Sequence, residues 1–345
     1  MGLLQETCDA IHSRSKEIEQ HIIKNWNDAS DSKQYGRLVN MVAQYGAATN
    51  QKNVTIPKPC MIIASADHGV ADMGVSAYPK ETTVGMTQNY LIPKGAGANS
   101  LANYCGATME VIDMGIAADM SWVPGLRSHK LGMGTKNFVE EPAMTREQAI
   151  EGIETGIKLV QEKMANGYNV FLVGEMGISN TTASALMTAK FAGLTAEEAT
   201  GRGTNISDER LKLKQRIVHD VLVKYQDIPK DDAIGILATV GGFEFTCIVG
   251  VILGAAAHHG MVIIDGFNTS ACALVAKTLV PASMDYVMAS HLSAEKAAKS
   301  SLQNLGLEAY VDLGLCLGEA SGGSVQMGML DLAVYMYKSV TGGKA

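Results

Sequence analysis

Short apolar runs, each ending in small or acidic residues, recur along this 345-residue chain and limit the folds open to it. The runs show little polar alternation, and longer stretches rich in Ala, Leu, Glu and Lys separate them. Strands that are apolar on both faces and alternate with helices predict a parallel sheet with helices on both faces. The expected strands are 61–69, 109–115, 170–177, 234–242, 261–267 and 286–293.

Polar side chains stand at the ends of several of these runs. Ligands of parallel sheets bind at the carboxyl ends of the strands, where such side chains meet. We therefore expect Asp67, Glu175, Asp265 and Ser293 to gather at one edge of the sheet.

The two ends of the chain differ from this pattern and read as helices. Ile18, Ile22 and Trp26 are spaced as on one helix face, and the segments 35–46 and 325–340 are also helical in pattern. We expect three parts: residues 1–45 as the first half of a small helical subdomain, residues 46–325 as the α/β domain, and residues 326–345 as a helix that returns to the subdomain.

The charge balance and the apolar segments exclude several classes of protein. With 28 basic and 35 acidic residues the formal net charge is −7, without a basic stripe, which argues against binding nucleic acid. The apolar segment 247–265 is interrupted by His258, His259 and Gly260, so it predicts a helix, a turn and a buried strand instead of a membrane span.

The cysteines and the first residues bear on metal binding and location. The six cysteines are far apart and form no CxxC pair, which argues against zinc and against a disulfide framework. We expect no metal, and reduced thiols in a cytoplasmic protein. The start of the chain has acidic residues where a secretory signal has basic ones.

Two glycine-containing motifs were candidates for ligand loops. "GAGANS" (95–100) follows Pro93-Lys94 instead of a strand, so a glycine-rich helix start fits it better than a dinucleotide loop. "GEMGISNTT" (174–182) follows an expected strand and opens a helix, whose N-terminus offers free N–H groups to an anion. A helix capped by Asn180 or Thr181, with Glu175 in solvent, explains this second motif equally well.

The segment "GRGTNISDERLKLKQR" (201–216) combines a glycine turn with a charged helix start. A surface helix whose charges match its dipole explains most of this pattern. On the pattern alone, a phosphate contact from Lys214 is the less favoured reading.

Eight segments of the chain resemble segments of the nicotinate-nucleotide–dimethylbenzimidazole phosphoribosyltransferases, the CobT family, and they occur in the same order as in that family. The resemblance runs from about residue 60 to about residue 330. The matching segments are "ADHGV…GVSAYPKE" (66–81), "VIDMGIAAD" (111–119), "GEMGISNTT" (174–182), "GRGT" (201–204), "GGFE" (241–244), "DGF" (265–267), "ASHLSAE" (289–295) and "VDLGLCLGE" (311–319).

The resemblance implies a doubly wound, mostly parallel sheet, a small subdomain built from the chain ends, and a dimer, either of identical chains or with a paralogous subunit. It implies transfer of phosphoribose from nicotinate mononucleotide to an aromatic base, without a cofactor. Glu319 matches the proposed general base, and Glu175 matches the second carboxylate. The expected substrate-binding residues are Gly177, Asn180, Thr181, Gly203, Lys214 and Ser293 on the nucleotide side, and Ser76, Val84 and Leu317 on the base side.

The chemistry of this transfer agrees with these two carboxylates. Nicotinate leaves from a positively charged ring nitrogen and needs no proton, whereas the incoming base must lose one. A carboxylate in a mostly apolar setting has a raised pKa and is a stronger base, as the role of Glu319 requires. Glu175 is suited to stabilise positive charge on the ribose ring in the transition state.

Two departures from the family pattern leave the identity of the base open. Relatives usually carry "GEGTG" where this chain has Glu319-Ala320-Ser321-Gly322-Gly323, and Val84 stands in place of a glutamine that contacts the base. A less polar pocket wall favours broad acceptance of bases, phenol and p-cresol included. A non-catalytic paralogue that supports a catalytic partner is the alternative, and a nucleotide-dependent oxidoreductase is disfavoured because no strand precedes "GAGANS".

Overall fold

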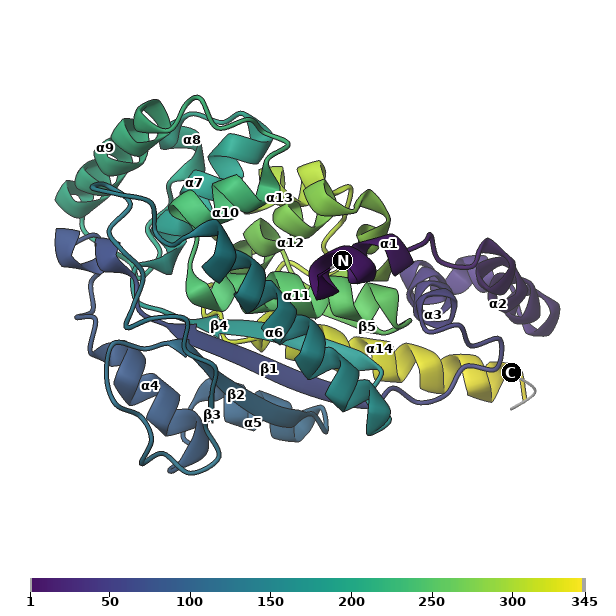
Figure 1. Ribbon diagram of the computed structural model, residues 1–345. Coiled ribbons are helices and arrows are strands. Elements are labelled where there is room, and N and C mark those ends of the chain that lie inside the picture. Colours follow the sequence, from purple (N-terminus) through teal and green to yellow (C-terminus); the bar gives the residue numbers. More distant parts are fainter. Residues whose placement is uncertain (1, 343–345) are drawn as a thin grey trace.

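Six parallel strands form one sheet in the computed structural model, which describes residues 2–342 (Figure 1). Their order across the sheet is β3-β2-β1-β4-β5-β6, and all neighbouring strands run parallel. The strands are β1 (Pro59–Ala66), β2 (Thr108–Gly115), β3 (Arg127–Ser128), β4 (Val170–Met176), β5 (Met261–Ile264) and β6 (Val287–Ala289). The expected α/β class with a parallel sheet is confirmed.

Five of the six expected strands are present, and one expectation was wrong. The run 234–242 forms helix α10 (Ala233–Val240), which begins where the Asp232 side chain accepts a hydrogen bond from the Gly235 N–H at 2.9 Å. A short buried helix and a buried strand are equally apolar all round, so the run alone could not separate them. The two-residue strand β3 was not foreseen.

Helices cover both faces of the sheet (Figure 1). On one face lie α6 and α11, and on the other lie α5 and α14. The helices other than α10 are α1 (Leu3–Ala10), α2 (Lys16–Ala29), α3 (Arg37–Ala48), α4 (Thr82–Leu91), α5 (Gly97–Tyr104), α6 (Arg146–Ala165), α7 (Asn180–Ala192), α8 (Ala196–Ala199), α9 (Asp208–Lys224), α11 (Phe243–Ala257), α12 (Phe267–Leu279), α13 (Ala298–Leu305) and α14 (Ser321–Val340). Three short 3₁₀ helices are η1 (Ser32–Tyr35), η2 (Gly69–Met73) and η3 (Pro281–Tyr286).

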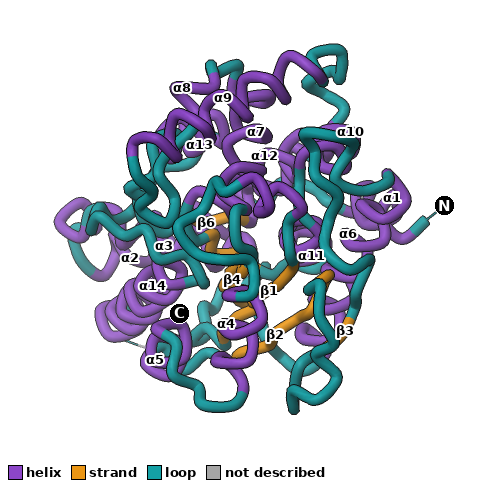
Figure 2. The backbone as a smooth tube through the Cα atoms, turned by 90° about the vertical axis from the view of Figure 1, so that its left-hand side faces the viewer, coloured by secondary structure: helices purple, strands orange, loops and turns teal. Residues whose placement is uncertain are grey.

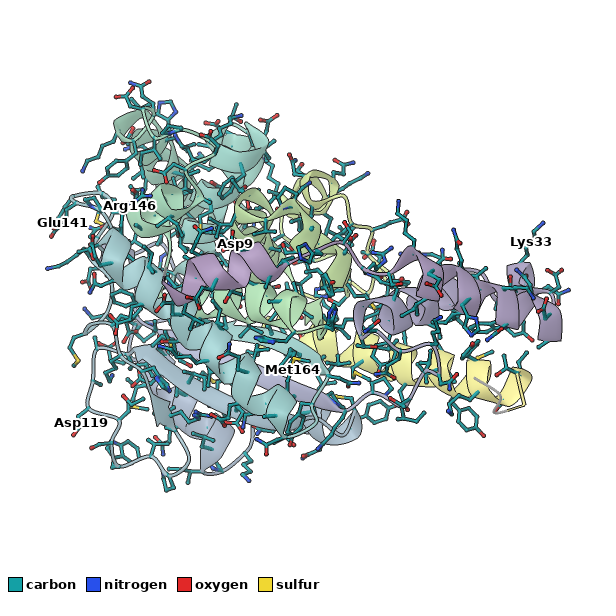
Figure 3. All side chains as sticks on the ribbon, turned by 45° about the vertical axis from the view of Figure 1, so that its right-hand side comes forward. Asp9, Lys33, Asp119, Glu141, Arg146 and Met164 are labelled. Atoms are coloured by element: carbon teal, nitrogen blue, oxygen red, sulfur yellow. The ribbon has the colours of Figure 1, made fainter. Side chains whose placement is uncertain are left out.

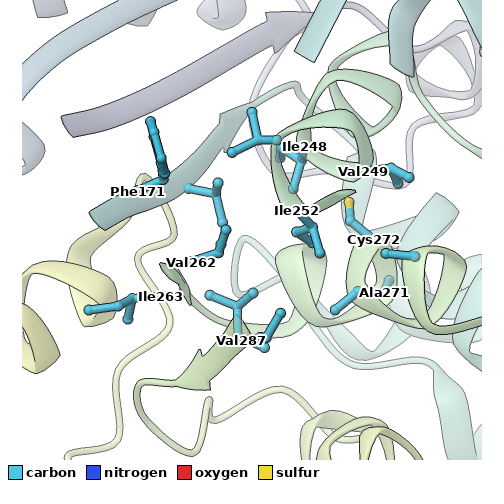
Figure 4. Packing of buried hydrophobic residues seen from close by; sticks show 14 of the residues in the cluster. Phe171, Ile248, Val249, Ile252, Val262, Ile263, Ala271, Cys272 and Val287 are labelled. Carbon is cyan, nitrogen blue, oxygen red and sulfur yellow. The ribbon is translucent and has the colours of Figure 1, made fainter. Parts of the chain in front are cut away.

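The core lies between the sheet and the helices α11 and α12 (Figure 4). Every residue of β1 and of β5 is buried, as the unbroken apolar runs predict. Figure 4 shows Ile248 and Ile252 of α11 beside Val262 of β5 and Val287 of β6. Burial of such side chains contributes about 1.5–3 kcal/mol each. The apolar runs thus fix the sheet in the middle of the molecule.

The helices α2 and α3 pack with α14, so segments from the two ends of the sequence lie side by side (Figure 2). The rings of Trp26 and Tyr337 lie 5.3 Å apart between their centroids, and both side chains are buried. This group projects away from the sheet, with Lys33 near its outer end (Figure 3). Helix α14 begins at Ser321, before the expected boundary at 326. The division of the chain into separate subdomains stays a prediction.

The order of the strands changes direction between β1 and β4. The chain adds β2 and β3 on one side of β1, and then β5 and β6 on the far side of β4. In open parallel sheets this switch point is where ligands bind, outside the carboxyl ends of the strands. Figure 2 views this side of the molecule, where α4 lies in front of β1 and β2. The fold therefore directs attention to the residues that end β1 and β4.

Candidate active site

Glu175 is the penultimate residue of β4, beside β1 and therefore at the switch point. Its side chain is buried, and its Oε2 accepts a hydrogen bond from the Asn180 side-chain amide. Burial raises the pKa of Glu175 from its ordinary value of 4.5 to about 8. The amides of Asn268 and Asn180 oppose this rise, and the charges of Glu244 and Asp265 add to it. Glu175 is thus a carboxyl group that holds its proton near neutral pH.

Glu319 lies in a tight turn directly before α14. Gly318, Glu319 and Ala320 all have left-handed backbones, with φ of 80°, 58° and 60°. For residues other than glycine this conformation costs roughly 1–3 kcal/mol each, and such strain clusters at functional sites. The turn is held by Asp265, whose Oδ1 accepts from the N–H groups of Gly322 at 2.7 Å and Gly323 at 3.3 Å.

The environment of Glu319 makes it a stronger base than an exposed glutamate. The residue is 6% exposed, and burial raises the pKa of its carboxyl group to about 7. The hydroxyl of Tyr90 opposes the rise, and the charge of Asp265 adds to it. Glu319 therefore has a pKa close to the optimum for a general base at neutral pH.

The turn that carries Glu319 packs against Glu175 and the end of β4. A Cβ placed on Gly318 would lie 2.9 Å from Glu175 Oε1, and one on Gly174 would lie 2.8 Å from the carbonyl carbon of Glu319. The glycines let the turn approach the end of β4 this closely. Since Oε2 of Glu175 is bonded to Asn180, Oε1 is the oxygen that faces the turn. The pair is suited to accept a proton and to stabilise a positive charge in one place.

Asn180 does not cap α7, which was one interpretation of its motif. The residue before the helix is Ser179, whose side chain makes no capping hydrogen bond. Asn180 instead donates from Nδ2 to Glu175 and accepts at Oδ1 from Asn268 Nδ2 at 3.0 Å. The alternative of a solvated Glu175 beside a capped helix does not describe this structure.

A buried lysine lies next to the start of the same helix. Lys214 of α9 is 1% exposed, and its Nζ donates to the Thr181 hydroxyl at 2.8 Å. Burial lowers the pKa of Lys214 to about 8, and Glu295 opposes that shift. A Cβ on Gly203 would lie 2.7 Å from the Thr181 hydroxyl and 3.4 Å from Lys214 Nζ. Lys214, Thr181 and Gly203 therefore share one location, as an anion site needs, and the surface-helix interpretation of Lys214 is wrong.

Ser293 is linked to Gly203 through Glu295, whereas Gly177 has different neighbours. The Ser293 hydroxyl accepts from the Glu295 N–H at 3.3 Å, and Glu295 Oε1 accepts from the Gly203 N–H at 2.9 Å. Gly177 follows β4, where a Cβ would meet the Ala66 carbonyl at 2.6 Å. Ser293 is thus connected to Gly203, whereas Gly177 packs against the end of β1.

The three residues expected on the base side have separate neighbours. The Ser76 hydroxyl lies 3.2 Å from that of Thr204, next to Gly203. Val84 of α4 packs on a small cluster with Ile116, Met120 and Val123. Leu317 is 56% exposed and lies beside Gly97 of α5. The structure does not bring these three side chains into direct contact.

Some residues of the site were not foreseen as candidates. Tyr90 and Asn268 carry no local sequence signal, whereas His68 stands in "ADHGV" and Glu244 ends "GGFE", two of the segments that carry the resemblance. Asp67, Asp265 and Ser293 do follow strands, as expected. Within residues 2–342, no three His, Cys, Asp or Glu side chains gather as a metal site would require. No helix in the same range is both long enough and apolar enough to span a membrane.

Comparison with known proteins identifies the family of this chain. A family model described as phosphoribosyltransferase matches residues 11–344. The nicotinate-nucleotide–dimethylbenzimidazole phosphoribosyltransferase of Chloroflexus aggregans is 42% identical over 86% of this chain and 84% of its own. That of Geobacter metallireducens is 41% identical over 88% and 86%. The crystal structure of CobT from Thermus thermophilus superposes with a TM-score of 0.88, at 32% identity over 93% of this chain and 96% of that chain. The chain belongs to the phosphoribosyltransferase family whose members include CobT.

Proposed function

We propose that this phosphoribosyltransferase moves phosphoribose from nicotinate mononucleotide to an aromatic base of the dimethylbenzimidazole kind, giving an α-ribotide and nicotinate. The observation that carries the proposal is that the turn carrying the buried Glu319 packs against the buried Glu175 at the switch point of the sheet. The names of the relatives supply the substrates.

Glu319 is the general base in this proposal. The bond between the ribose C1′ and the nicotinate ring nitrogen breaks, and its electron pair neutralises that nitrogen. A ring nitrogen of the base attacks C1′ from the opposite face, which inverts the β-linkage to an α-linkage. The other ring nitrogen gives its proton to the Glu319 carboxylate, whose raised pKa of about 7 makes it a competent acceptor.

Glu175 stabilises the charge that builds up on the ribose ring. As nicotinate departs, C1′ and the ring oxygen share a positive charge, and a carboxylate in a water-poor site lowers the energy of that state. The Asn180 amide holds Oε2, and Oε1 faces the turn that carries Glu319. Because both carboxyl groups have raised pKa values, the rate should rise with pH through the range of about 7 to 8.

Lys214 binds the phosphate in this proposal, with Thr181, Gly203 and Ser293 around it. A buried ammonium group beside a hydroxyl and a close backbone is a suitable anion site. Gly177 contributes its N–H to the nucleotide. No step of this reaction calls for a metal ion or a cofactor.

The acceptor is proposed to include phenol or p-cresol beside 5,6-dimethylbenzimidazole. Val84 presents an apolar side chain on α4, and Leu317 is exposed and apolar, whereas Ser76 is the polar residue on this side. A phenol loses its proton from the oxygen that attacks C1′, so Glu319 would serve both classes of base.

We further propose that the protein acts in the cytoplasm as a dimer, either of two copies or with a paralogue. Tyr104 of α5 and Leu332 and Tyr335 of α14 are exposed apolar side chains that would suit an association surface. The alternative of a non-catalytic support subunit is disfavoured because both carboxylates are retained.

The experiment that tests the acceptor range offers nicotinate mononucleotide with a panel of bases and identifies the ribotides by mass. Ribotides of both dimethylbenzimidazole and p-cresol are expected. Products from benzimidazoles alone, with a paralogous subunit also present, would restrict the proposal to benzimidazoles.

A further inference from the structure

A histidine and a glutamate without a role in the reaction above are buried beside Asn180. His68 follows β1, and Glu244 lies in the first turn of α11. Neither side chain has any solvent exposure, and His68 Nε2 lies 2.6 Å from Glu244 Oε1. A buried carboxylate is costly unless it is paired, so a pair at this depth, next to a reacting group, calls for a role.

The surrounding backbone is shaped to hold this pair. A Cβ on Gly242 would lie 2.4 Å from Glu244 Oε2 and 2.5 Å from His68 Cε1. A Cβ on Gly177 would lie 3.1 Å from Glu244 Oε1 and 3.1 Å from His68 Cδ2. Two glycines therefore leave the space that the two side chains fill. Gly177 directly follows β4, and Gly242 directly precedes α11.

A chain of hydrogen bonds, each with a defined donor and acceptor, connects His68 and Glu244 to Glu175. The Ser184 hydroxyl donates to Asn268 Oδ1 at 2.7 Å, and Asn268 Nδ2 donates to Asn180 Oδ1 at 3.0 Å. Asn180 Nδ2 then donates to Glu175 Oε2 and, at 3.5 Å, to Glu244 Oε1. One amide group thus bridges the two carboxylates, and the other end of the bridge is held by His68.

Several charged or ionisable groups face this bridge from the neighbouring elements. Asp67 follows β1, Asp265 follows β5, and Cys272 lies on α12. The charge of Glu244 helps to raise the pKa values of Glu175, Asp67 and Cys272, whereas His68 lowers that of Asp67. Glu244 and His68 therefore act in opposite directions on the pKa of Asp67.

We propose that His68 and Glu244 are positioning residues for phosphoribosyl transfer, which hold Asn180 so that Glu175 has one oxygen anchored and the other free for the substrate. The inference rests on the proposed role of Glu175. Glu244 orients the bridging amide, and the hydrogen bond with His68 Nε2 holds Glu244 in place.

The test is the pH dependence of kcat in two variants. Glu244→Gln keeps the size of the side chain but removes a negative charge near Glu175, so the acid limb should move to lower pH by roughly 0.5–1 unit. His68→Ala removes the hydrogen-bond partner that holds Glu244, so Asn180 should be held less firmly and kcat should fall by roughly ten-fold. The KM for nicotinate mononucleotide should change by only about two- to three-fold, because neither residue contacts Lys214.

Asp113→Asn is the matched control. Asp113 is also buried near the carboxyl end of a strand and is paired with Lys130 at 2.8 Å, but it lies on β2 and has no hydrogen bond to Asn180. This variant should lower the thermal stability and leave the position of the acid limb unchanged. If His68 and Glu244 had a purely structural role, their variants would likewise lose thermal stability and keep the acid limb of the wild type.

An unmoved acid limb in a folded Glu244→Gln protein, or a folded His68→Ala protein with the kcat of the wild type, would overturn the inference. Glu244→Gln decides the question alone if His68→Ala does not fold. Glu175→Gln separates this inference from the role on which it rests. If that variant is crippled while the limb of Glu244→Gln stays in place, only the positioning inference fails. If Glu175→Gln turns over as fast as the wild type, the role of Glu175 itself fails.

Discussion

Gly318 approaches the Glu175 carboxylate so closely that a methyl group at position 318 would lie 2.9 Å from Oε1. The backbone of Gly318 also has a φ of 80°, a conformation that side chains disfavour. The turn that carries Glu319 can therefore lie against the end of β4 only because position 318 is a glycine. The contact links the Glu175 carboxylate to the turn that carries Glu319.

Gly318→Ala should consequently damage both stability and turnover. The left-handed backbone should cost about 1–2 kcal/mol of unfolding free energy, and the displaced Glu175 or Glu319 should slow the reaction by roughly ten-fold or more. Gly314→Ala is the control, because Gly314 has a φ of 65° but nothing within 4 Å of an added Cβ. It should lose similar stability in thermal unfolding and retain the wild-type rate. Equal losses of rate in both variants would mean that the contact with Glu175 has no influence.

Glu319→Gln should lower kcat by ~10²–10⁴, the usual effect of removing a positioned general base. The variant keeps the shape of the side chain, so binding of nicotinate mononucleotide, measured by calorimetry, should change little. Combining it with Glu175→Gln should add little further loss if the two groups act as a unit. A rate within a few-fold of the wild type would remove Glu319 from the role of base.

Glu175→Gln should stabilise the protein at alkaline pH. The folded protein holds this proton up to a pKa of about 8, whereas the unfolded chain releases it near 4.5. The contribution of Glu175 to the free energy of unfolding is therefore greatest below pH 4.5. It falls by about 1.4 kcal/mol per pH unit as the pH rises from 4.5 to about 8. The variant, which mimics the protonated form, should lose this dependence.

Thermal unfolding of Glu175→Gln and the wild type at pH 5 and at pH 8 measures the effect. The two proteins should differ little at pH 5, and the variant should melt at a higher temperature at pH 8. A variant that melts at a lower temperature than the wild type at both pH 5 and pH 8 would contradict the raised pKa of the buried Glu175.

The position of Glu175 could be predicted from sequence, because the apolar run before it forms β4 and parallel strands place their carboxyl ends at one edge. The pairing of His68 with Glu244 could not, because it joins residues 176 positions apart. Short buried strands and short buried helices have the same apolar composition. The run 234–242 therefore predicts a strand, although it forms α10. The burial of Lys214 likewise depends on how α9 packs on α7, which the charges of α9 do not reveal.

Lys214→Ala should weaken binding of nicotinate mononucleotide by about ten-fold or more and leave binding of free nicotinate nearly unchanged, because only the nucleotide carries a phosphate. Lys212→Ala, an exposed lysine of the same helix, is the control and should bind both ligands as the wild type does. Nucleotide affinity should also decline as the pH rises through about 8, where Lys214 loses its proton. A similar loss for both ligands would place Lys214 away from the phosphate.

The most direct test of the account is the reaction itself. The purified protein, nicotinate mononucleotide and 5,6-dimethylbenzimidazole should give the α-ribotide and nicotinate in equal amounts, identified by mass and by the anomeric configuration. The wild type should turn over repeatedly, and the Glu175→Gln, Glu319→Gln double variant should be slower by at least ~10². Absence of ribotide from the wild type, or equal rates of product formation in both proteins, would contradict the account.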